Sequence, residues 1–129
     1  MNIYVDADAV ANWEKGKYDL PAWIQQHHSN DTLFFPATVW QQLLYGKFAW
    51  ETARAQKRSR YLQAIGLPVA AFARAHAERA AQLTAELKLQ TIGFADFQIA
   101  ASALVDGADL ISFNTEHFSR VPGLKVITP

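Results

Sequence analysis

Three acidic residues lie where an α/β fold would bring their side chains together. Asp6 follows an apolar run rich in strand formers, Asp96 lies at the start of a second apolar segment, and Glu116 comes just after a third. In an open α/β sheet, ligands bind beyond the carboxyl ends of the strands. Carboxylates gathered there repel one another, and a divalent cation relieves that repulsion. The pattern therefore indicates a metal-dependent enzyme, since Mg²⁺ prefers oxygen ligands and leaves room for a substrate phosphate.

Each acid also has a structural explanation. Asp6 can cap a helix that begins at Ala7, and Asp8 can be a solvated or capping residue. Asp96 can favour the positive end of its own helix, although an acid among apolar neighbours needs a partner. Glu116 alone is typical of a surface residue. Spacing by itself leaves the structural and the metal-binding interpretations open.

The composition narrows the function classes. The chain has 129 residues, of which 50% are hydrophobic, and this suits one domain with a real core. It has no cysteine, which excludes disulfides, thiolate nucleophiles and zinc–thiolate sites. Its formal net charge is zero, whereas many nucleic-acid-binding proteins are strongly basic. Any basic surface that contacts nucleic acid must therefore be local. The N-terminus does not resemble a signal peptide, and no apolar stretch approaches the roughly 18 residues of a membrane span. We expect a cytoplasmic protein without a membrane partner.

Strands and helices alternate along the chain. The expected strands cover residues 3–5, 32–35, 67–70, 109–113 and 124–127, the last at a sheet edge. The expected helices cover residues 7–14, 21–28, 38–46, 51–65, 72–89 and 94–106, with Thr38 as a cap and Gly46 as a stop. This order predicts an α/β fold with a parallel sheet.

Four segments in this order resemble the motifs of PIN-domain ribonucleases. They are IYVDAD at 3–8, TVWQQLLYG at 38–46, IGFADFQIAA at 92–101, and ISFNTEHF at 111–118 followed by VPGL at 121–124. The match runs from end to end of the chain. The last segment is especially similar to the VapC toxins of type II toxin–antitoxin systems.

The resemblance implies a three-layer α/β/α PIN-like domain over residues 1–129, with a central, mostly parallel sheet. It also implies Mg²⁺- or Mn²⁺-dependent cleavage of RNA, a cognate antitoxin and a homodimer. Asp6 and Asp96 match the two principal metal-binding acids of the family. Asn114 stands where the fourth motif has aspartate or asparagine, and Asp8 and Glu116 are possible helpers.

One position departs from the family pattern. The second motif normally has a glutamate where this chain has Gln42. An amide brings no negative charge and is not a usable general base, so we expect weaker metal binding and weaker activity.

Two functions therefore remain open. The first is a VapC-like endoribonuclease toxin, in which a metal-activated water attacks the phosphodiester and Asn114 and Gln42 assist. The second is a weakened or inactive PIN module that binds RNA or an antitoxin without cutting. A small phosphotransfer domain is a more distant alternative, because it would need a lysine that residues 110–114 lack.

Three further features lie outside the motifs. One helix face near Arg60 is basic and carries Arg54, Lys57 and Arg58. This face is either simply solvated, or it contacts RNA phosphates or an acidic antitoxin segment. His117 is expected to support the site or face solvent rather than act as a general base. A dimer or antitoxin surface is expected from four apolar residues: Trp40, Leu43, Leu44 and Phe48.

Overall fold

The computed structural model describes residues 1–88 and 92–129. In this part of the chain, five strands form one sheet in the order β3-β2-β1-β4-β5, and every pairing is parallel. The strands are β1 (Asn2–Val5), β2 (Thr32–Pro36), β3 (Val69–Ala70), β4 (Asp109–Ile111) and β5 (Val126–Ile127). The predicted parallel sheet is confirmed, and the last strand lies at an edge as expected.

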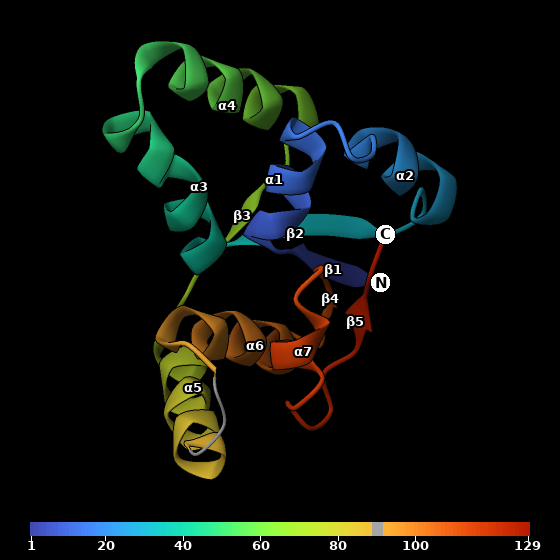
Figure 1. Cartoon of the computed structure of the whole chain (residues 1–129). Helices are drawn as coiled ribbons and strands as arrows, with labels where there is room; N and C mark the ends of the chain where they lie inside the picture. The colour runs from blue at the N-terminus through green and yellow to red at the C-terminus, as the bar shows by residue number, and fades with distance from the viewer. Residues whose placement is uncertain (89–91) are drawn as a thin grey trace.

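Helices cover both faces of the sheet. Four lie on one side: α1 (Ala7–Glu14), α2 (Leu20–His27), α3 (Ala37–Ala49) and α4 (Thr52–Ile65). Three lie on the other: α5 (Arg74–Leu87), α6 (Phe94–Asp106) and α7 (Thr115–Phe118). Figure 1 shows the sheet between these two groups, which is the predicted three-layer α/β/α arrangement. None of the helices in the described ranges has the length and apolar character needed to cross a bilayer.

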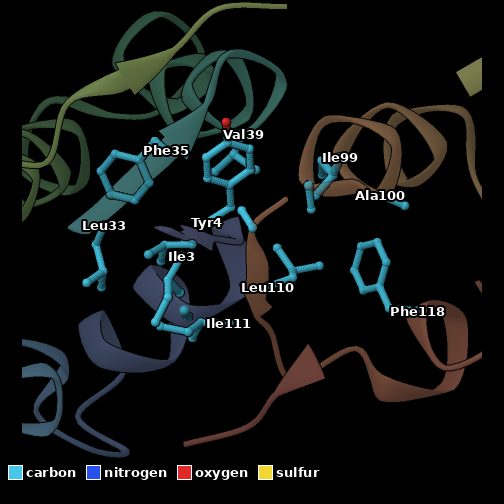
Figure 2. Close-up of a cluster of buried hydrophobic side chains, with 14 of the residues drawn as sticks. Ile3, Tyr4, Leu33, Phe35, Val39, Ile99, Ala100, Leu110, Ile111 and Phe118 are labelled. Atoms are coloured by element: carbon cyan, nitrogen blue, oxygen red, sulfur yellow. The ribbon is translucent and has the colours of Figure 1, made fainter. Parts of the chain in front are cut away.

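The central strands place alternate side chains in the two layers of core. Tyr4 pairs with Leu110, and both side chains face α6. Ile99 of α6 and Phe118 of α7 complete the packing on this side (Figure 2). Ile3 and Val5 point to the opposite face and are fully buried there. Because β1 is covered on both faces, its residues read as a continuous apolar run rather than as an alternating one.

The second predicted motif folds differently from the expectation at both of its ends. Pro36, not Thr38, is the N-cap of α3, and the Thr38 hydroxyl instead donates to the side-chain oxygen of Gln98 at 3.2 Å. Gly46 does not end the helix, which continues to Ala49. The glycine is needed inside the helix because a Cβ there would overlap the indole ring of Trp50.

Smaller differences concern lengths. The strand predicted over 109–113 ends at Ile111, since the backbone N–H of Phe113 turns away to the side chain of Asp8. The strands predicted over 67–70 and 124–127 have two residues each. The helix predicted over 72–89 begins at Arg74, and its predicted end at Leu89 lies outside the described residues.

Arg58 belongs to the core and not to the predicted basic face. Its guanidinium makes two hydrogen bonds to the carboxylate of Glu14 and donates to the carbonyl of Leu43 at 3.0 Å. It also lies 4.5 Å from the ring of Trp50, which Arg54 covers at 3.6 Å. A guanidinium used in this way joins α4 to α1 and α3 and has no face left for a phosphate. Arg54, Lys57 and Arg60 remain exposed on α4.

Candidate active site

The predicted site residues converge where the order of the strands reverses. From β1 the chain continues to β2 and β3 on one side, whereas β4 and β5 lie on the other side. Asp6 directly follows β1, and its backbone N–H donates to the carbonyl of Ile111 in β4 at 2.9 Å. The crevice at such a switch point is where open α/β sheets bind ligands.

Asp6 combines the structural and the chemical interpretations. Its Oδ1 caps α1 by accepting from Ala7 N–H at 2.8 Å, and its Oδ2 accepts from the hydroxyl of Ser112 at 2.7 Å. The residue is only 6% exposed. Burial, followed by the nearby charge of Asp8, raises the pKa of Asp6 from 3.8 to about 7. Burial beside a second acid therefore makes the ionised form of Asp6 unfavourable, and a nearby positive charge would relieve this cost.

Asp8 secures the turn after β4. Its carboxylate accepts from the backbone N–H of Phe113 at 3.1 Å, and the hydroxyl of Ser112 lies 3.3 Å away. Burial raises the pKa of Asp8. The side chain is therefore half-buried and hydrogen-bonded, and it holds in place the segment that carries Asn114.

Asp96 lies in the first turn of α6, where the helix dipole favours a negative charge. Its Oδ2 is 2.9 Å from Nδ1 of His117 in α7, and the amide nitrogen of Asn114 is 3.0 Å from the same Nδ1. The backbone N–H of Asn114 donates to Ser112 Oγ at 3.0 Å. Polar contacts therefore connect Asp96, Asn114 and Asp6 through His117 and Ser112.

A cleft of about 1140 Å³ opens beside these groups. Asp6, Asp8, Asn114 and Gln42 line it, so the structure brings Gln42 of α3 to the same cavity as the acids. Glu116 does not belong to this set, because its carboxylate is 80% exposed and lies 3.6 Å from Arg120. Its expected role as a helper has no support in the geometry.

The rest of the cleft wall is aromatic and apolar. Tyr45 and Phe48 of α3 and Phe94 of α6 line it while remaining 65%, 81% and 77% exposed. Trp40 and Leu44 contribute half-buried side chains. Leu43, expected on the same surface, is 1% exposed and belongs to the core, so that part of the prediction is wrong.

The donor set is compatible with a cation held by few protein ligands. Asp8 and Asp96 both raise the pKa of Asp6 through their charges, and no lysine or arginine lines the cleft within the described residues. In residues 1–88 and 92–129, no group of three or more histidine, aspartate or glutamate side chains is arranged to hold a metal ion. Mg²⁺ is commonly held by one or two carboxylates, with waters and substrate phosphate completing its shell.

Comparison with known proteins decides the family. The PIN domain model matches residues 3–124. The chain belongs to the PIN-domain family.

Solved structures share the fold of this PIN domain. A chain of VapBC2 from Rickettsia felis, bound to a promoter DNA fragment, has a TM-score of 0.87 at 20% identity and covers 100% of this chain and 99% of its own. VapBC-1 from nontypeable Haemophilus influenzae has a TM-score of 0.84 at 22% identity, with 99% and 98% covered. DNA-bound VapBC from Salmonella typhimurium has a TM-score of 0.82 at 20% identity, again with 99% and 98% covered. No curated protein matches the sequence.

Sequence reasoning missed two features of this PIN domain. Ser112 is fully buried and contacts both Asp6 and Asn114, yet a serine at the end of a strand carries no specific signal. The aromatic wall was also missed as a lining of the cleft, because Phe94 and Tyr45 belong to different helices that only the fold brings together.

Proposed function

We propose that this PIN domain, residues 1–129, is a Mg²⁺- or Mn²⁺-dependent endoribonuclease and acts as a VapC-like toxin in the cytoplasm. Metal-dependent ribonuclease activity is the general function of the family. The observation that carries the proposal is the convergence of Asp6 and Asp96 on one carboxylate-rich centre at the switch point. Neighbours in VapBC complexes support the assignment to toxins.

The protein's side chains have distinct parts in this reaction. Asp6 and Asp96 would hold the ion, and Asn114 and Gln42 would make polar contacts with the phosphate or the attacking water. A bound divalent ion would supply an activated water and offset the charge that develops on the phosphodiester. No side-chain nucleophile is required, which agrees with the absence of cysteine.

The cleft supports RNA with unpaired bases as the substrate. Exposed aromatic faces stack on nucleobases, and every base offers such a face. Phe48 and Phe94 provide two of these faces in the cleft that Asp6 and Asp8 also line, and the ammonium of Lys47 lies 5.9 Å from the ring of Phe48. In a duplex the bases stack on one another, so they are not available to the aromatic side chains. A cleft that combines carboxylates for a metal with an aromatic wall therefore fits single-stranded RNA better than a duplex.

The test is cleavage of single-stranded RNA by the purified protein with Mn²⁺. We expect cleavage by the wild type, loss of cleavage in Asp96→Asn and faster cleavage in Gln42→Glu. Glu86→Gln, an exposed change on α5, is the matched control and should cleave as the wild type does. If neither the wild type nor Gln42→Glu cuts any RNA with Mn²⁺, the enzyme assignment is wrong.

A second candidate function is binding without cleavage, favoured by the missing charge at Gln42. Toxicity on expression separates the two: a toxic chain whose effect requires Asp6 is an enzyme. A harmless chain that still binds RNA or an antitoxin is a binding module.

We expect two protein partners, an antitoxin and a second copy of the chain. The neighbours belong to VapBC complexes, and an apolar surface on the wall of the cleft is formed by Trp40, Leu44 and Phe48. Light scattering after gel filtration, with and without Phe48→Glu, measures the self-association. A monomer at all concentrations would contradict the homodimer.

A further inference from the structure

One nitrogen atom of His117 faces two polar groups. Its Nδ1 is 2.9 Å from Oδ2 of Asp96 and 3.0 Å from the amide nitrogen of Asn114. The side chain is 29% exposed, and the next residue, Phe118, is fully buried and anchors α7. The imidazole is therefore held between the two groups and is not free to turn away from them.

The hydrogen-bonding capacity of Nδ1 determines what each neighbour must do. An imidazole nitrogen carries one hydrogen or one lone pair in the ring plane, whereas a carboxylate only accepts. A lone pair at Nδ1 would repel Asp96 across 2.9 Å, so Nδ1 must carry the hydrogen and donate it. An amide NH₂ placed 3.0 Å from that N–H would set donor against donor.

Rotation of the Asn114 amide by a half turn removes this conflict. The amide oxygen then takes the place beside Nδ1 and shares its hydrogen with Asp96. The NH₂ group becomes the part of the side chain that is left for the cleft, which Asn114 lines. Since the backbone N–H of Asn114 is already used by Ser112, this NH₂ is the donor that the residue can offer a ligand.

We propose that His117 is a positioning residue that fixes Asp96 and makes Asn114 a hydrogen-bond donor to a substrate phosphate oxygen, rather than a metal ligand. The assignment rests on the proposed ribonuclease function for the identity of the substrate. Because the imidazole holds Oδ2 of Asp96, the other carboxylate oxygen would remain for a cation. Partners of metal-binding carboxylates of this kind change metal affinity by about 10–100-fold when removed.

Two matched variants test the role of Nδ1. In His117→Asn the amide nitrogen takes the position of Nδ1, whereas in His117→Gln it reaches the position of Nε2. We expect Mn²⁺ affinity, measured by electron paramagnetic resonance without RNA, to stay within about 3-fold of wild type in His117→Asn and to fall about 10-fold or more in His117→Gln. Equal affinities in the two variants would overturn the positioning role.

Asn114→Ala tests the donor role. A phosphate donor predicts unchanged Mn²⁺ affinity without RNA and a KM for RNA raised about 10-fold, as for a lost hydrogen bond to a charged group. A ligand predicts that Mn²⁺ affinity falls about 10-fold or more. The second result would overturn the assignment of Asn114.

The protonation site can be read in the metal-free wild type, which removes dependence on the folding of any variant. Two-dimensional ¹⁵N nuclear magnetic resonance of the histidine ring should show hydrogen on Nδ1 of His117. A neutral ring with hydrogen on Nε2 alone would overturn the inference. If this signature holds and Mn²⁺ binds but RNA is not cut, the function of the site is wrong while the positioning of Asp96 stands.

Discussion

Replacing Asp6 by asparagine should stabilise the metal-free protein at neutral and alkaline pH. Asp6 is 6% exposed, and the pKa of its carboxyl group is raised from 3.8 to about 7, mainly by burial. At about 1.4 kcal/mol per pKa unit, keeping this carboxylate ionised above pH 7 lowers the free energy of unfolding by about 4 kcal/mol. Asparagine avoids this penalty because it is neutral, and its oxygen can still accept from Ala7 N–H.

The stability contributed by Asp6 should fall as the pH rises. Between pH 3.8 and about 7 the folded protein keeps a proton on Asp6 that the unfolded chain loses. The contribution of Asp6 to stability is therefore fully present below pH 3.8 and is lost as the pH rises toward about 7. Asp6→Asn lacks this loss, so its advantage over the wild type should grow over the same window and level off above it.

Urea unfolding in a chelator, at about pH 5 and about pH 8, measures the difference. We expect Asp6→Asn to gain about 2–4 kcal/mol relative to wild type between the two conditions. Asp19→Asn is the control, since Asp19 also caps a helix but is exposed. A loss of stability in Asp6→Asn that is equal at both pH values would refute the reasoning. Added Mn²⁺ should stabilise the wild type and reduce the advantage of the variant.

Two further changes test the packing that positions the site. Arg58→Met should lower the unfolding free energy by about 3–5 kcal/mol, because it leaves unpaired the carboxylate of Glu14, whose side chain is only 12% exposed. The exposed change Arg60→Met should alter the unfolding free energy by less than about 0.5 kcal/mol. A small effect of Arg58→Met together with weaker RNA binding would restore the basic-face interpretation. Gly46→Ala should cost about 1–3 kcal/mol in urea unfolding, because its methyl group would overlap the ring of Trp50. An unchanged midpoint would show that the ring moves aside freely.

The architecture was predictable because the signals that specify it are local. The run at β1 is apolar without alternation, as expected for a strand buried on both faces. Gly66 and Gly107 end α4 and α6 in left-handed conformations, as helix stops of this kind do. Gly46 is also a glycine, but the structural reason for it is different, because the ring of Trp50 packs against it. Composition cannot separate a glycine that ends a helix from one that makes room for a ring.

The chemistry of the site was less accessible because it depends on contacts over long sequence separations. The alternatives expected for Asp8 were a solvated residue, a helix cap or a metal ligand, and none of them included the hydrogen bond that its carboxylate accepts from the backbone of Phe113. Arg58 looked like part of a charged face, and only the tertiary structure reveals Glu14 as its partner. Periodicity places both side chains on a helix, but it does not show which element packs against that helix.

The fold does not require an amide in place of a carboxylate at position 42. Gln42 is exposed on α3 and lines the cleft, so a carboxylate there would keep its solvent. Asp6, by contrast, is buried and already carries the unfavourable charge of the site. A glutamate at position 42 would therefore add little to the cost of folding while adding a negative charge beside the proposed ion. Since stability gives no reason to avoid that charge, we expect Gln42→Glu to change Mn²⁺ affinity far more than it changes the unfolding midpoint.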